Sequence, residues 1–146
     1  MTENYWRPLE RTYYQIRAHF HYIGSLKLLA VPDLIDFGQH KLGKQTAFYP
    51  TILGHLEIKD TRIEQSPWKL TLQAEAPEGG QLYFQEDGKL LSLEEPVTVL
   101  QQTGSLNTTF EEWDESKGLF LTIPKEQQKL GEESMTFHWT LTTNVE

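Results

Sequence analysis

The chain has 146 residues, 38% hydrophobic and 23% charged, a composition typical of one folded globular domain. Its formal net charge of −8 argues against binding to nucleic acid or to anionic membranes, because such contacts require clustered lysine and arginine. No apolar run approaches the roughly 20 residues that span a bilayer, which excludes direct membrane insertion by a helix. Cysteine is absent, so a disulfide framework is excluded, although secretion is not.

The N-terminal third predicts a polar arm followed by strands. Residues 1–11 form the arm, which lacks the apolar core and cleavage site of a secretory signal. From Thr12 to Ile23 apolar and polar residues alternate, which predicts a strand that ends at Gly24-Ser25. Leu26–Val31 resumes as a second strand before Pro32. The turn that follows carries apolar residues expected to close one end of the core: Leu34, Ile35 and Phe37.

The middle of the chain predicts one loop, one strand and one hairpin. Residues 39–55 carry scattered apolar positions between glycines and a proline, and predict a loop with one short strand. In the next strand, Leu56–Ile63, Asp60 and Arg62 place opposite charges on one face. Asp87-Gly88 lies between two apolar runs and predicts a two-residue hairpin turn, because both residues tolerate positive φ. This register pairs Glu86 with Lys89, Phe84 with Leu91, and Leu82 with Leu93.

Two alternating runs, each containing a Trp-x-Leu tripeptide, predict the central strands. Trp68 and Leu70 share one face of the first run, and Trp139 and Leu141 share one face of the second. Val97–Gln101 and Gly118–Ile123 predict further strands, and Lys125–Leu130 one helical turn. Strands separated by turns predict an all-β fold: a single antiparallel β-sandwich or β-barrel-like domain with long loops, covering residues 12–146.

Candidate catalytic and metal-binding residues are sparse. The carboxylate pairs Glu94/Glu95 and Glu111/Glu112 lie in polar surroundings that would not raise a pKa, and no phosphate-binding loop or nucleophile elbow is present. His19 and His21 share a strand face, but without an obvious third ligand we predict no metal site. We therefore predict no enzymatic activity and no cofactor. Trp113 stands out in the polar loop 103–117, where its indole either folds over the sandwich edge or stacks on a flat ligand such as a sugar ring.

Taken together, these segments resemble the WxL-domain family of Gram-positive cell-surface proteins. The resemblance covers residues 24–146 and rests on two Trp-x-Leu tripeptides 71 positions apart, each with its own flanks. The segment ending in Leu34-Ile35-Asp36-Phe37-Gly38 is similar to the family's opening, and Asp60-Thr61-Arg62 to its Asp-x-Arg stretch. Thr122-Ile123-Pro124 before the second tripeptide is similar to its closing segment.

The resemblance implies an exported, non-enzymatic domain that attaches non-covalently to peptidoglycan and cooperates with WxL-interacting proteins at the cell surface. Its signal peptide would have been removed from this chain. The family signature implies that Trp68, Leu70, Trp139 and Leu141 are wall-binding determinants, whereas the alternation of both strands predicts that they build the core. In the alternative interpretation, an edge strand or the 103–117 loop docks a WxL-interacting surface protein, and wall attachment is indirect.

Overall fold

The computed structural model describes residues 5–17, 24–113 and 116–143. The strands are β1 (Tyr5–Arg17), β2 (Leu26–Ala30), β3 (Leu34–Asp36), β4 (His40–Lys41), β5 (Ala47–Phe48), β6 (Thr51–Leu53), β7 (Leu56–Asp60), β8 (Trp68–Ala74), β9 (Gln81–Glu86), β10 (Lys89–Ser92), β11 (Val97–Gln102), β12 (Leu106–Thr108), β13 (Lys117–Thr122) and β14 (Gly131–Thr143). A 3₁₀ turn, η1 (Lys125–Gln127), lies where one helical turn was predicted. Among the described residues no helix has the length and apolar character that crossing a bilayer requires.

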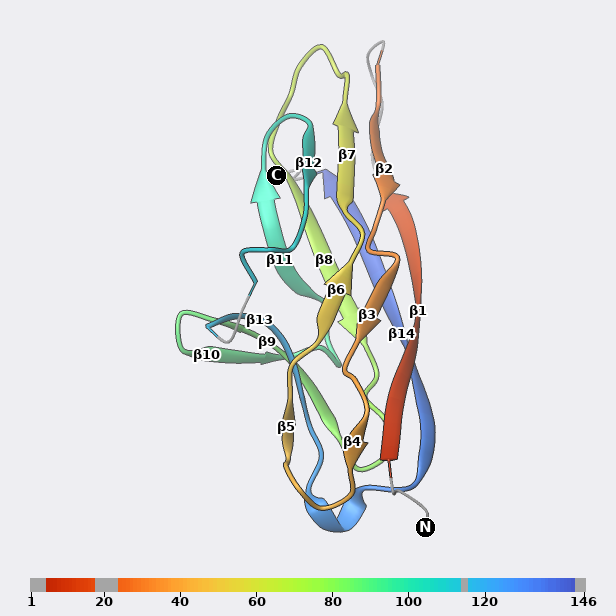
Figure 1. Ribbon diagram of the computed structural model, residues 1–146. Helices are drawn as coiled ribbons and strands as arrows, with labels where there is room; N and C mark the ends of the chain where they lie inside the picture. Colours follow the sequence, from red (N-terminus) through yellow and green to blue (C-terminus); the bar gives the residue numbers. More distant parts are fainter. Residues whose placement is uncertain (1–4, 18–23, 114–115, 144–146) are drawn as a thin grey trace.

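Within the described residues the strands form four sheets, and none of these sheets closes into a barrel (Figure 1). The largest sheet has the order β11-β8-β14-β1-β4, and the others are β10-β9-β13-β5, β12-β7-β2 and β3-β6. Nearly all neighbouring strands run antiparallel. The predicted all-β fold is confirmed in its open, sandwich-like form, and the barrel-like alternative is not adopted.

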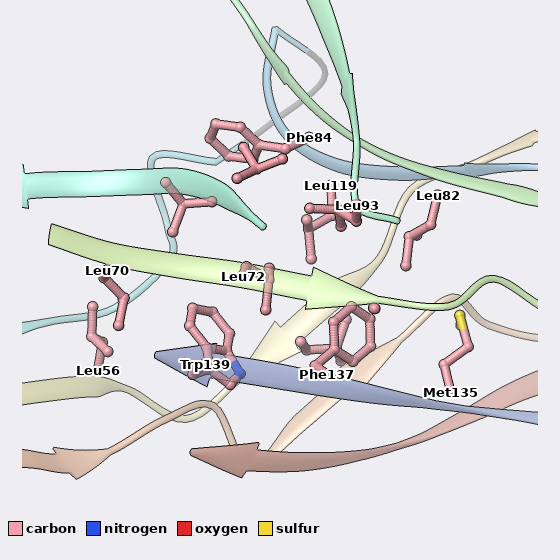
Figure 2. Packing of buried hydrophobic residues seen from close by; sticks show 14 of the residues in the cluster. Leu56, Leu70, Leu72, Leu82, Phe84, Leu93, Leu119, Met135, Phe137 and Trp139 are labelled. Carbon is pink, nitrogen blue, oxygen red and sulfur yellow. The ribbon is translucent and has the colours of Figure 1, made fainter. Parts of the chain in front are cut away.

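One continuous hydrophobic core fills the space between the largest sheet and the smaller ones. Figure 2 shows Trp139, Phe137 and Met135 projecting from β14 toward residues of other strands, among them Phe84 and Leu119. The alternating burial of β8 and β14 follows the alternation of their sequences, since successive side chains of a strand point to opposite faces. Ile35 and Phe37 are buried as expected, whereas Leu34 is half-buried.

The first strand differs from the prediction at both its start and its direction. β1 begins at Tyr5, inside the segment predicted as a polar arm, and it pairs with β14 in parallel rather than antiparallel fashion. A polar composition does not prevent pairing, because the ladder is formed by backbone groups. Parallel neighbours need a long connection, and nearly the whole chain lies between these two strands. The predicted end of the strand, residues 18–23, lies outside the described residues, as do His19 and His21.

The predicted hairpin is confirmed in turn and register. Asp87 and Gly88 have φ values of 55° and 78°, as a type I′ turn requires, and Lys89 pairs with Glu86 across it. Although Glu86 is paired with Lys89 by register, its carboxylate forms an ion pair with the Lys117 ammonium, 3.4 Å away. The predicted apolar pair of Phe84 and Leu91 is only partly buried, since Leu91 at the open edge is 43% exposed.

Two segments predicted as loops contain more strand than expected. Residues 39–55 form three short strands, β4, β5 and β6, which pair with β1, β13 and β3 respectively. The 103–117 loop contains β12, which pairs with β7. Strands this short have no readable alternation of their own, and their positions depend on partners distant in sequence.

Candidate functional site

The two Trp-x-Leu motifs lie side by side in the largest sheet. In the antiparallel register of β8 and β14, Leu141 pairs with Leu70, Trp139 with Leu72, and Trp68 with Thr143. Trp68, Leu70 and Leu141 are fully buried, and Trp139 is 1% exposed. All four signature side chains therefore belong to the core, which agrees with the alternation of their strands.

The two indoles differ in their hydrogen bonding. Trp68 Nε1 donates to the Gly104 carbonyl at 2.8 Å, which ties the start of β8 to the turn before β12. Trp139 Nε1 is buried and has no hydrogen-bond partner among the described residues. An unpaired buried N–H costs free energy. The Trp139 indole therefore stabilises the core by burying its apolar surface, and the unpaired N–H offsets part of that stabilisation.

The predicted charge pair at the end of β7 forms a buried ion pair. Arg62 Nε and Nη2 donate to the two Asp60 carboxylate oxygens, each at 2.8 Å, and Nη2 also donates to the Ser66 carbonyl. The Asp60 side chain is fully buried, and its hydrogen bond from Arg62 lowers the pKa of the carboxyl below its ordinary value of 3.8. The Asp60 N–H donates to Ser105 Oγ, so this network joins β7, the approach to β8 and the turn before β12. It positions Trp68, and the geometry assigns it a structural role.

The remaining titratable candidates are dispersed. In the described part of the chain no group of three or more His, Asp or Glu side chains is arranged to hold a metal ion. The His40 ring donates an N–H hydrogen bond to the Phe37 carbonyl and packs on Phe48. His55 lies 3.6 Å from Glu57, and the predicted carboxylate pairs are exposed. These described residues lie apart from one another and form no catalytic grouping.

Trp113 lies half-buried at the edge of the sandwich. Its indole packs on Phe110 and Phe84, with ring centroids 4.9 and 5.3 Å away. Trp113 also lines a hollow of about 160 Å³ together with Tyr49 and Pro50. Trp113 therefore folds over the edge of the sandwich, as one of the two interpretations predicted, and stacking on a ligand stays a prediction.

Trp113 also lines another cavity, of about 190 Å³. Two signature residues, Leu70 and Trp139, line it, and Phe110 lines both cavities. The exposed residues Thr109 and Glu112 also line it, so this cavity runs from the surface loop to the signature motifs. Apart from this cavity the motifs are enclosed by core side chains.

The outward face of the β10-β9-β13-β5 sheet carries an aromatic row that was not predicted. We call it the aromatic strip and define it as Tyr83, Phe120 and Tyr49. The Phe120 ring centroid lies 5.3 Å from that of Tyr83 and 5.7 Å from that of Tyr49. The signal was present in the predicted hairpin, since a register that turns Leu82 and Phe84 inward turns Tyr83 outward.

Comparison with models of known protein families finds no match for this chain, and comparison with curated proteins finds none either. What the fold and the site define is therefore a class: an all-β domain with a tryptophan-rich core and aromatic side chains at its surface.

Proposed function

We propose that this protein is a non-enzymatic cell-surface domain that attaches non-covalently to the peptidoglycan of the Gram-positive cell wall. The proposal starts from the resemblance of residues 24–146 to the WxL-domain family. It assigns no reaction, cofactor or metal to the domain, and it places the protein outside the cell.

The observation that supports it most is the pairing of the two Trp-x-Leu motifs. They are 71 positions apart in the sequence, yet they meet on adjacent strands with Leu70 opposite Leu141. The motifs thus form one structural unit, as a family signature that specifies a fold would. Since all four side chains are buried, the proposal gives them the role of scaffold and leaves contact with the wall to surface residues.

Trp113 is the surface contact that the sequence itself suggested. Aromatic rings can pack on the apolar C–H face of a sugar ring, and the hollow that Trp113 shares with Tyr49 is open to such a group. The net charge of −8 disfavours contact with anionic wall polymers, so attachment would use uncharged sugar or peptide groups, bridging cations or a basic patch near Arg11 and Arg17.

Sedimentation with protein-free peptidoglycan sacculi tests the proposal. We expect the wild-type protein to sediment with sacculi and Trp113→Ala to sediment less. Ile63→Ala is the control, because it removes an apolar side chain that is 69% exposed and lies outside the hollow, and it should leave sedimentation unchanged. Circular dichroism would verify that each variant is folded. Wild-type protein that stays in the supernatant would contradict wall attachment.

The second candidate function is docking of a WxL-interacting surface protein, with indirect wall attachment. It is favoured by β10, an edge strand on which Leu90 and Leu91 are 52% and 43% exposed. An open strand edge can accept a partner strand through backbone hydrogen bonds. A domain that binds such a partner but not bare sacculi would support this function over the first.

A further inference from the structure

We infer that the aromatic strip of Tyr83, Phe120 and Tyr49 is the binding surface for an uncharged glycan chain. The inference deepens the proposed function by naming its contact surface and its ligand class, and to that extent rests on it. It does not involve the signature motifs, which are buried in the core, whereas the strip lies on the outward face of the β10-β9-β13-β5 sheet.

The strip occupies a place where a solvated sheet is normally polar. Within the sheet, Tyr83 pairs directly with Phe120, and both alternate with buried neighbours that face the core. Tyr49 follows β5 and is 45% exposed, Tyr83 is half-buried, and Phe120 is 8% exposed between the two tyrosines. The surface therefore presents two accessible phenol rings supported by a third ring.

No outward-facing position in the four strands of this sheet carries a charged residue. By register and alternation, the outward residues of the sheet are Ala47, Gln81, Tyr83, Gln85, Leu90, Ser92, Gly118, Phe120 and Thr122. None of these is Asp, Glu, Lys or Arg, although 23% of the chain is charged. The nearest ion pair, Glu86 with Lys117, lies at positions of the opposite parity.

This lack of charge determines the class of ligand. A surface without charge offers nothing to a phosphate or carboxylate polymer, and the net charge of −8 repels such polymers from the domain as a whole. An uncharged sugar chain fits, because its C–H faces pack on aromatic rings and its hydroxyls bond to amides and hydroxyls. Gln81 is already oriented at the strip, since the Tyr83 hydroxyl donates a hydrogen bond to its Oε1.

The hollow beside Trp113 extends the strip. Tyr49 belongs to both, and Gly118, at an outward position of β13, also lines the hollow. About 160 Å³ is less than the roughly 300 Å³ of the smallest drug-sized sites. The hollow therefore suits a substituent of a sugar, such as an acetamido group, rather than a separate ligand.

Calorimetric titration with chitotetraose, an uncharged oligomer of N-acetylglucosamine, tests the inference on the intact chain. We expect saturable binding by the wild type, and a dissociation constant raised about three- to tenfold by Tyr49→Ala and by Tyr83→Leu, the latter keeping apolar bulk without a ring. Tyr83→Phe keeps the ring and removes the hydroxyl that orients Gln81, so we expect an intermediate loss. Ile63→Ala serves as the control, with affinity unchanged.

The outcomes separate this inference from wall attachment. If wild-type protein sediments with sacculi and Tyr49→Ala and Tyr83→Leu sediment equally well, the strip is not the contact, but wall attachment stands. If the strip variants weaken chitotetraose binding and the wild type fails to sediment with sacculi, the glycan surface stands and the wall proposal fails. The inference is overturned if the wild-type protein shows no saturable binding at millimolar chitotetraose. It is also overturned if the wild-type protein self-associates and Tyr49→Ala abolishes that self-association.

Discussion

Replacement of each core tryptophan by phenylalanine should destabilise the domain unequally. Both indoles are almost fully buried, so both substitutions remove similar apolar volume and leave similar cavities. Trp68→Phe also removes a hydrogen bond to the Gly104 carbonyl, worth about 0.5–1.5 kcal/mol. Trp139→Phe instead removes an N–H that has no partner among the described residues, which relieves a penalty of about 1–3 kcal/mol. These effects add to about 1.5–4.5 kcal/mol, and we expect Trp68→Phe to be less stable than Trp139→Phe by about 2 kcal/mol, near the lower end of that range.

Urea unfolding followed by far-ultraviolet circular dichroism measures this difference. With a denaturant slope of about 2 kcal/mol per molar, the unfolding midpoints of the two variants should lie about 1 M apart. A Trp139→Phe midpoint at or below that of Trp68→Phe would refute the reasoning from the indole N–H groups. The folded variants should still sediment with sacculi, because neither indole reaches the surface. A folded Trp68→Ala protein that no longer sediments would instead make the motif a direct contact.

Three further results are expected. Because Arg62 lowers the folded-state pKa of Asp60 below 3.8, the ion pair stabilises the fold above about pH 4, and this contribution is lost as pH falls through the folded-state pKa. In urea unfolding, Asp60→Asn should lower the free energy of unfolding by about 3 kcal/mol near pH 7 and by less near pH 3. An equal loss at both pH values would contradict this. Gly24→Ala, whose Cβ would lie 2.2 Å from the Thr61 carbonyl oxygen at φ +113°, should lower the free energy of unfolding by about 3 kcal/mol, against about 1 kcal/mol for Gly88→Ala, where the space is open. Sedimentation with sacculi should hold or strengthen from about 50 to about 300 mM salt, and a steep loss would show that attractive charges carry the attachment.

The long strands could be predicted because their sequences repeat the geometry of a pleated strand. In β8 and β14, alternation alone assigned Trp68, Leu70, Trp139 and Leu141 to one face, and that face is buried. The hairpin at Asp87-Gly88 was equally local, since a two-residue turn with positive φ determines which residues pair.

The candidate surfaces could be predicted only in part. Trp113 was noticeable as an aromatic side chain in an acidic loop, but its contacts with Phe84 and Phe110 depend on how that loop returns to the sheet. The aromatic strip joins Tyr83 to Phe120 and Tyr49, which come from three separate parts of the chain. Each of these residues alone resembles an ordinary strand residue.

Periodicity and turn chemistry by themselves determined the all-β class, the inward faces of the long strands and the hairpin register, because these depend on neighbours close in sequence. Only the tertiary structure decided the parallel pairing of β1 with β14, the short strands of residues 39–55 and the uncharged outward face of the β10-β9-β13-β5 sheet. Those features are made by segments far apart in the chain. Their pairing depends on backbone hydrogen bonds and on the shape of the shared core, which no local pattern of residues encodes.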